Sequence, residues 1–159
     1  MARNEVQIDA PREQVYALLS DPRTYGRWVV GSQRIRAADA HWPDPGSAFD
    51  HRVGVGPFGL KDHTDVLSAR APELLELCAR ASPLPPARIR LQLTERDGGT
   101  HLVMEEAPAS QLLSKLIGPI GHRLLWLRNV EALRRLKGLA EGRIPLPAGR
   151  LPARDAPHE

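Results

Sequence analysis

Residues 87–106, ARIRLQLTERDGGTHLVMEE, predict two strands joined by a tight turn. Apolar and polar side chains alternate over 87–95 and again over 100–106, which is the pattern of half-buried β-strands. Asp97-Gly98-Gly99 between the two runs is typical of the turn in a β-hairpin. We therefore expect an antiparallel sheet in this part of the chain.

The same alternation recurs towards the N-terminus. It predicts strands over 29–37, 47–55, 60–68 and 74–81, and Gly56-Pro57-Phe58-Gly59 is a four-residue hairpin connection. A short strand at 6–8 comes first, and Pro11 and Asp21-Pro22 after it predict two short helices. Seven strands in an antiparallel meander are thus expected.

The last third of the chain is predicted to be helical. One apolar stripe at helical spacing runs from Leu113 to Leu136 and on to Ala140. Gly118-Pro119 interrupts it, so a kink or a short helix should precede the long one. Residues 143–159 hold four prolines and no aromatic residue, so we expect a disordered, Pro-rich tail after one domain spanning 1–142.

Composition limits the kinds of protein to which the chain can belong. Its 159 residues are 42% hydrophobic and 26% charged, as in a single globular domain. The lone Cys78 excludes an internal disulfide and a multi-cysteine zinc module. The net charge of +3 comes without a run of like charges, so nucleic acid is not an expected partner. Without a membrane-length apolar run or an apolar signal stretch, a cytoplasmic protein is expected.

The order of the elements has a physical consequence. An antiparallel sheet of this length curls and presents a concave apolar face. A long helix with one apolar stripe can lie across that face. Because a curved sheet and a helix touch imperfectly, we expect a cavity between them, suited to small apolar molecules.

This order resembles the helix-grip fold of the START/SRPBCC superfamily, and in particular its bacterial polyketide cyclase/dehydratase-like branch. The resemblance rests on VQIDAP at 6–11, VYALL at 15–19, HWPDPGS at 41–47, HRVGVGP at 51–57, GTHLVME at 99–105 and RNVEALRRL at 128–136. It implies an α+β fold with a curved seven-stranded sheet wrapped around a long C-terminal helix. Its members include binders, transporters, cyclases, dehydratases and chaperone activators, so the resemblance implies the fold more than the chemistry.

Strand alternation predicts which side chains face the cavity. Two of them, His51 and Glu106, are ionisable and are candidates for proton transfer, because polyketide ring closure and dehydration move protons next to a carbonyl. The blander interpretation, which we favour, is that His51 only hydrogen-bonds a neighbour and Glu106 reaches water or pairs with an arginine. The other expected cavity residues are Trp28, Trp42, Phe49, Val53, Asp62, Thr64, Leu77, Leu91, Met104, Leu113, Ile117 and Leu124.

The sequence of the strand over 60–68 is compatible with two registers. One turns Asp62 and Thr64 towards the cavity, and a one-residue slip would turn His63 and Asp65 there instead. We prefer the first, because it leaves Lys61 and His63 in solvent rather than buried without a partner.

No metal site and no cofactor are expected. The chain has no His-x-x-x-His and no cysteine pair, and GVGPFG at 54–59 lacks the Lys-Ser/Thr end of a phosphate-binding loop. The expected partner is a hydrophobic small molecule, of the polyketide, lipid or isoprenoid kind, bound in the internal cavity. Two alternatives stay open: a cyclase or dehydratase that uses His51 and Glu106, and a chaperone-activator-like interaction module without a ligand.

Overall fold

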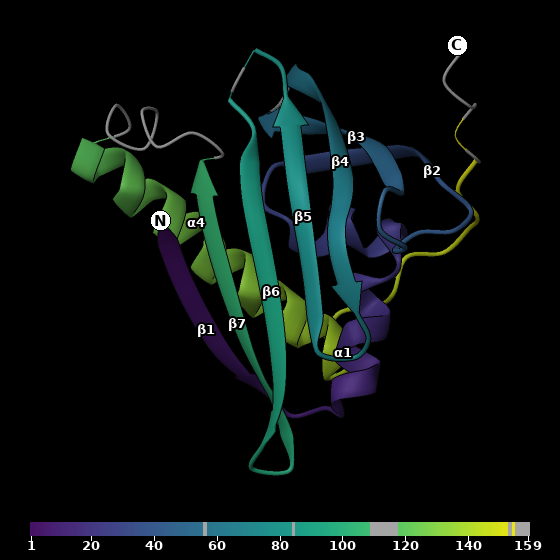
Figure 1. Ribbon diagram of the computed structural model, residues 1–159, viewed down its shortest axis with the longest axis vertical. Helices are drawn as coiled ribbons and strands as arrows, with labels where there is room; N and C mark the ends of the chain where they lie inside the picture. Colours follow the sequence, from purple (N-terminus) through teal and green to yellow (C-terminus); the bar gives the residue numbers. More distant parts are fainter. Residues whose placement is uncertain (56, 84, 109–117, 153, 155–159) are drawn as a thin grey trace.

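A curved antiparallel sheet of seven strands, crossed by one long helix, makes up most of the molecule (Figure 1). The computed structural model describes residues 1–55, 57–83, 85–108, 118–152 and 154. The strands are hydrogen-bonded in the order β1-β7-β6-β5-β4-β3-β2, so β1 and β2 form the two edges. In chain order the elements are β1 (Ala2–Ile8), α1 (Arg12–Leu19), η1 (Pro22–Thr24), α2 (Tyr25–Trp28), β2 (Ser32–Ala38), β3 (Ala48–Val55), β4 (Phe58–Arg70), β5 (Leu74–Ala81), β6 (Ala87–Arg96), β7 (Gly99–Pro108) and α4 (Gly118–Ala140). The expected α+β helix-grip fold is confirmed.

The β6–β7 hairpin has the turn that its sequence predicts. Asp97 has a φ of 51° and Gly98 a φ of 73°. A pair of left-handed residues matches the right-handed twist of the flanking strands, which is why Asp-Gly suits this turn. Leu91 and Leu102 on the inner face of the two strands have no solvent exposure, as the alternation predicts.

Strand β4 has the register preferred from the sequence. Asp62 and Thr64 are buried, at 6% and 3% exposure, while Lys61 is exposed and His63 half-buried on the other face. In the pairing with β3, Asp62 lies directly opposite His51. The register thus brings two polar side chains together on the inner face of the sheet.

Short helices follow β1 as expected. Asp21 begins η1, and its carboxylate accepts a 3.0 Å hydrogen bond from the backbone N–H of Arg23. Helix η1 leads directly into α2, whose Tyr25 and Trp28 are each only 2% exposed. These two rings form an aromatic cluster, with centroids 4.8 to 6.1 Å apart, together with Phe49 and Trp42.

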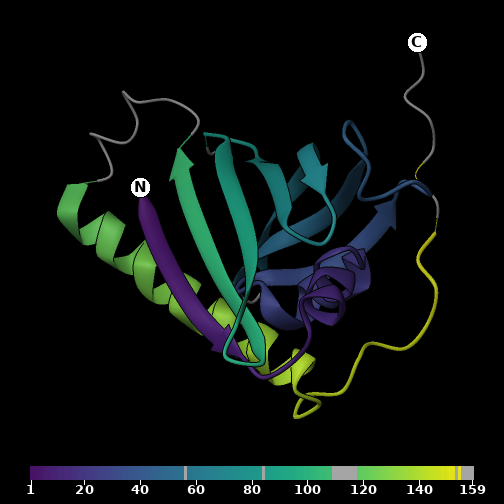
Figure 2. The same cartoon turned by 60° about the horizontal axis from the view of Figure 1, so that its bottom comes forward.

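Helix α4 packs on the sheet mainly along its C-terminal half. Leu133 and Leu136 are 2% and 0% exposed, whereas Ile120 and Leu124 are 78% and 63% exposed. Figures 1 and 2 show the reason, because the N-terminal end of α4 extends past the edge strand β1. The expectation of one buried stripe along the whole helix is therefore wrong for its N-terminal half.

Helix α4 begins at Gly118, which has a φ of 62°. The kink or short helix expected before this point falls on residues 109–117, outside the described part of the chain. Among the helices that the structure describes, none is long and apolar enough to cross a membrane.

The segment after α4, expected to be a disordered tail, is described over 143–152 and at 154. It runs beside β2 at the edge of the sheet (Figure 1). Ala38 donates its backbone N–H to the carbonyl of Pro152 and accepts from the N–H of Arg154. The Arg154 guanidinium also donates to the carboxylate of Asp39 at 3.1 Å.

Candidate functional site

A cavity of about 80 Å³ lies between the inner face of the sheet and the helices α2 and α4. Its walls come from α2, β3 to β7 and α4, so no single segment of the chain forms it. Most of the wall is apolar, with polar groups at a few positions, as is usual for small-molecule sites. The lining residues are Tyr25, Trp28, Val29, Val30, His51, Val53, Asp62, Thr64, Leu77, Ala79, Ile89, Met104, Glu106, Arg128, Asn129 and Ala132.

The first polar group of the wall is centred on His51, which is 3% exposed. Its Nε2 lies 2.8 Å from Asp62 Oδ2 and 3.3 Å from Thr64 Oγ1, and its Nδ1 lies 3.0 Å from Ser32 Oγ. In the neutral imidazole, Nε2–H donates to the carboxylate, so Nδ1 is left to accept from the Ser32 hydroxyl. Both ring nitrogens of His51 are therefore already engaged within the protein.

Asp62 is held as an anion by this arrangement. Burial alone would raise the pKa of its carboxyl, but the hydrogen bond from His51 lowers it, as do the hydrogen bonds from the backbone N–H groups of Arg80 and His63. The N–H of Arg80 donates to Asp62 Oδ1 at 2.8 Å. The net result is a pKa below the ordinary value, because hydrogen bonds to a carboxylate favour its charged form.

The second polar group is centred on Glu106, which is 5% exposed at the end of β7. Arg128 Nη2 donates to both of its carboxylate oxygens, at 2.7 and 2.6 Å, and Asn129 Nδ2 donates to Oε2 at 2.9 Å. Asn129 is only 1% exposed. The strand and the helix are thus joined across the cavity by a charged contact, in which Glu106 only accepts.

One buried hydrogen-bond donor in the cavity wall has no acceptor among the described residues. Trp28 is 2% exposed, and its indole Nε1 has no hydrogen-bond acceptor among the described residues. A buried N–H without an acceptor costs about 1–3 kcal/mol, so such groups are uncommon in folded proteins. An oxygen atom of a bound molecule would satisfy it.

The structure brings together His51 and Glu106 with six of the other residues predicted to face the cavity: Trp28, Val53, Asp62, Thr64, Leu77 and Met104. In this geometry His51 bonds its neighbours and Glu106 pairs with an arginine, which are the contacts that the favoured interpretation expects. These groups are nevertheless part of the cavity wall, as the strand alternation predicts.

Four of the other predicted cavity residues do not line it. Phe49 and Leu91 are fully buried in the core, and Trp42 packs edge-on against Phe49. Leu124 is 63% exposed, because the sheet does not reach under the N-terminal half of α4. The remaining two, Leu113 and Ile117, lie outside the described residues.

Three polar residues of the site were not singled out from the sequence. Asn129 lies four residues before Leu133, on the same face of α4, so helical spacing could have found it. Arg128 reaches Glu106 from beside that face. Alternation along the sequence could not show that Ser32 belongs to the site, because the pairing of β2 with β3 shifts by one residue between Ser32 and Arg34. Across the described residues, no three His, Cys, Asp or Glu side chains are grouped so that they could hold a metal ion.

Comparison with known proteins identifies the family. The family model described as "Activator of Hsp90 ATPase homolog 1-like protein" matches residues 9–136. The chain belongs to this family. Its place in the SRPBCC superfamily confirms the resemblance inferred from the sequence motifs. No curated protein matches the chain.

Solved structures share the family's fold. A protein from Chromobacterium violaceum superposes with a TM-score of 0.69 at 19% identity, over 87% of this chain and 96% of its own. DynU16, from the dynemicin biosynthetic locus, has a TM-score of 0.64 at 18% identity, over 89% of this chain and 47% of its own. The di-domain ARO/CYC StfQ of the steffimycin pathway has a TM-score of 0.67 at 14% identity, over 89% and 50%. At these identities the likeness is one of fold.

Proposed function

We propose that this protein binds a small, largely apolar molecule that carries oxygen acceptors, of the polyketide kind, in the cavity between the sheet and α4. The observation that carries the proposal is the buried Trp28 Nε1, which has no acceptor among the described residues although Trp28 lines the cavity. An oxygenated ring system suits this wall better than a plain hydrocarbon chain, because polar groups stand on both β3–β4 and α4. The fold likeness to StfQ and DynU16 is compatible with such a ligand.

The size of the cavity adds a condition. Pockets for drug-sized ligands usually measure about 300–1,000 Å³, whereas this cavity measures about 80 Å³. A polyketide-sized ligand therefore requires part of the wall to move outwards. We expect the N-terminal half of α4, which reaches the cavity wall at Arg128, to be the part that moves, since Ile120, Leu124 and Leu127 are exposed there.

The test uses Trp28 as its own reporter. The chain has three tryptophans, so the double variant Trp42→Phe/Trp126→Phe leaves Trp28 alone. We expect the fluorescence of Trp28 to change on titration with an anthraquinone as the polyketide probe, with micromolar affinity. Palmitate and farnesol, as lipid and isoprenoid probes, should bind more weakly because they offer fewer acceptors.

A cavity-filling variant supplies the control. Ala132 is 3% exposed and lines the cavity, so Ala132→Leu should weaken binding by about tenfold or more, because its added atoms take up the ligand's space. Ala17 is exposed on α1, and Ala17→Leu should leave the affinity unchanged. Equal effects of both variants would contradict the proposed site. A protein that takes up none of the three probes would favour the interaction module, the role named in the family's description.

A second candidate function, proton transfer to such a ligand, is favoured by the Ser32–His51–Asp62 hydrogen-bond chain in the cavity wall. An anionic carboxylate stabilises the imidazolium that forms when His51 takes a proton. Glu106 is less suited than the sequence indicates, because Arg128 and Asn129 engage both its oxygens. In a cyclisation assay with a linear polyketone, His51→Gln should abolish turnover and leave the affinity within about threefold, since binding does not use its proton. A wild-type protein without turnover would rule this role out.

A further inference from the structure

A row of like charges crosses the outer face of β2, β3 and β4. Arg34 lies opposite Arg52 in the pairing of β2 with β3, and Arg52 lies opposite Lys61 in the pairing of β3 with β4. All three side chains are exposed. Like charges placed directly opposite on neighbouring strands repel each other and destabilise the sheet.

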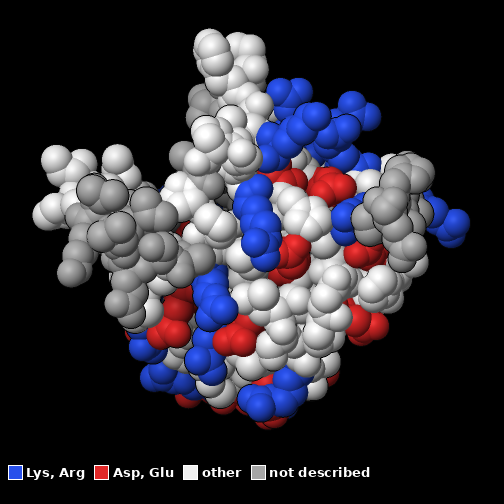
Figure 3. Space-filling model, turned by 45° about the horizontal axis from the view of Figure 1, so that its top comes forward, with Lys and Arg blue, Asp and Glu red and all other residues white. Residues whose placement is uncertain are grey.

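These side chains line a groove of about 760 Å³ between the sheet edge and the C-terminal segment. None of the described residues that line the groove is acidic. On the face in Figure 3, Lys and Arg gather at the upper edge, whereas basic and acidic side chains alternate below. The lining residues are Arg34, Ile35, Arg36, Arg52, Gly59, Lys61, Arg150, Leu151 and Pro152. We call this set the basic groove.

The cations of the basic groove differ from most other arginines of the protein. Arg12, Arg23, Arg70, Arg80, Arg90, Arg96, Arg128, Arg134, Arg135, Arg143 and Arg154 each lie within 4.0 Å of a carboxylate. None of the five groove cations has such a contact with a described carboxylate. Within the described part of the chain, the side chain of Arg52 donates to the carbonyl of Gly59, at 3.2 Å.

The neighbouring row of the same sheet face shows what a balanced row looks like. His63 Nδ1 lies 2.7 Å from Asp50 Oδ1, and Arg80 donates to Asp65 Oδ2 at 2.6 Å. Each of these side chains has a complementary partner on a neighbouring strand. Three of the five cations of the basic groove thus stand directly opposite one another without a described carboxylate partner, and this arrangement lowers the stability of the sheet.

We propose that the basic groove binds a small ligand that carries two or more phosphate groups. Adjacent strands lie about 4.8 Å apart, so the row from Arg34 to Lys61 spans only about 10 Å. Such compact spacing suits clustered phosphates better than an extended acidic peptide, whose like-facing side chains are about 7 Å apart. A volume of 760 Å³ is also that of a small-molecule site.

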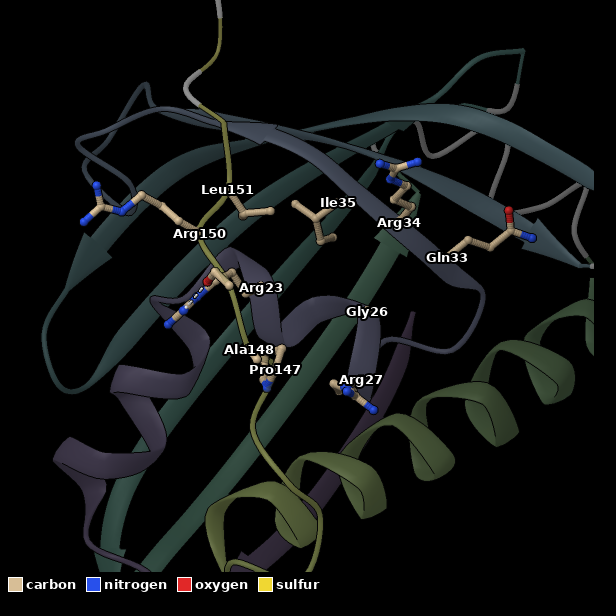
Figure 4. A pocket seen from close by; sticks show the side chains of 11 residues that line it. Arg23, Gly26, Arg27, Gln33, Arg34, Ile35, Pro147, Ala148, Arg150 and Leu151 are labelled. Carbon is tan, nitrogen blue, oxygen red and sulfur yellow. Dashed lines mark hydrogen bonds between the residues drawn. The ribbon is translucent and has the colours of Figure 1, made fainter.

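The adjoining hollow, of about 370 Å³, indicates how the rest of such a ligand would lie (Figure 4). There Arg150, Leu151, Ile35 and Arg34 follow one another in a row, so two apolar side chains stand between two guanidinium groups. Arginine is well suited to phosphate, because its planar fork donates two parallel hydrogen bonds. A less polar part of the ligand can rest on Ile35 and Leu151.

The test compares two variants that each lose three positive charges. Arg34→Gln/Arg52→Gln/Lys61→Gln removes the row, and Arg3→Gln/Arg90→Gln/Arg96→Gln removes three surface arginines that have carboxylate partners. Binding of inorganic tripolyphosphate is measured by calorimetry at roughly 0.15 M salt, where distant surface charges are screened. We expect the row variant to bind about tenfold more weakly or worse, and the paired-arginine variant to bind like the wild type.

Further arms of the experiment separate the sources of the phosphate. Vesicles containing phosphatidylinositol 4,5-bisphosphate that bind the wild type but not the row variant, without tripolyphosphate binding, would support the groove and assign it to a lipid headgroup. Equal losses in both variants, or no binding of either probe, would overturn the proposal. Tighter binding of duplex DNA than of both probes would also overturn it, in favour of a nucleic-acid surface.

Discussion

At the scale of single residues, each of three buried ionisable groups in this protein has a hydrogen-bonding partner. His51, Asp62 and Glu106 are at most 6% exposed, and each has a charged or polar partner within 2.9 Å. Burying a charge without such a partner costs several kcal/mol. The hydrogen bonds that offset the cost of burying these groups also oppose proton transfer, because a proton can move to a ligand only if one of the hydrogen bonds breaks.

The pH dependence of stability should report the buried anion of Asp62. Its folded pKa lies below the ordinary value, so its ionised form stabilises the protein above about pH 4, and this stabilisation is lost as the pH falls through the folded pKa. Asp62→Asn cannot titrate. We expect it to lower the free energy of unfolding by about 1–3 kcal/mol at pH 7, and by less at pH 3. Urea unfolding at several pH values measures the difference.

An exposed carboxylate provides the comparison. Asp97, in the β6–β7 turn, has a side chain that is 80% exposed, so Asp97→Asn should change the free energy of unfolding only slightly. A difference between wild type and Asp62→Asn that stays constant or grows towards acid would mean that Asp62 is not held as an anion.

At the scale of the strands, one substitution should have opposite effects at two places in the sheet. Arg52→Glu puts a negative charge opposite both Arg34 and Lys61, so we expect it to raise the free energy of unfolding by about 1 kcal/mol. Arg90 lies opposite Glu76, so Arg90→Glu should lower it by a similar amount. Thermal and urea unfolding of the two variants measure both signs. Destabilisation by Arg52→Glu would show that the row of cations carries no strain.

The strands are also where the sequence was most informative. Alternation located all seven strands and the inward faces of β3, β4 and β7, because one buried face imposes a period of two. It could not locate the irregularities of β2, where the pairing with β3 shifts twice. Since a shift changes which side chains face inwards, Ser32 and its hydrogen bond to His51 were beyond sequence reasoning.

At the scale of the whole molecule, the sequence predicted that a long helix crosses the sheet, but not where the helix leaves it. The apolar stripe continues past the point at which the sheet ends, so a pattern in the helix alone could not show that Leu124 is exposed. As a result, the C-terminal half of α4 is held firmly against the sheet and its N-terminal half is held weakly. Leu133, Leu136 and Leu139 secure the C-terminal half of α4, with no more than 3% exposure.

This unevenness predicts a gradient of local opening along α4. Amide hydrogens of residues 124–128 should exchange about tenfold faster than those of 133–139, because fewer buried contacts oppose opening there. One contact that holds the weak half is the hydrogen bond from Asn4 Nδ2 to the carbonyl of Trp126, at 3.2 Å. Asn4→Ala should therefore speed exchange at 124–128 and leave 133–139 unchanged. Hydrogen exchange followed by mass spectrometry measures both segments. Uniform exchange along the helix would mean that α4 moves as one body, and the cavity would then have to open elsewhere.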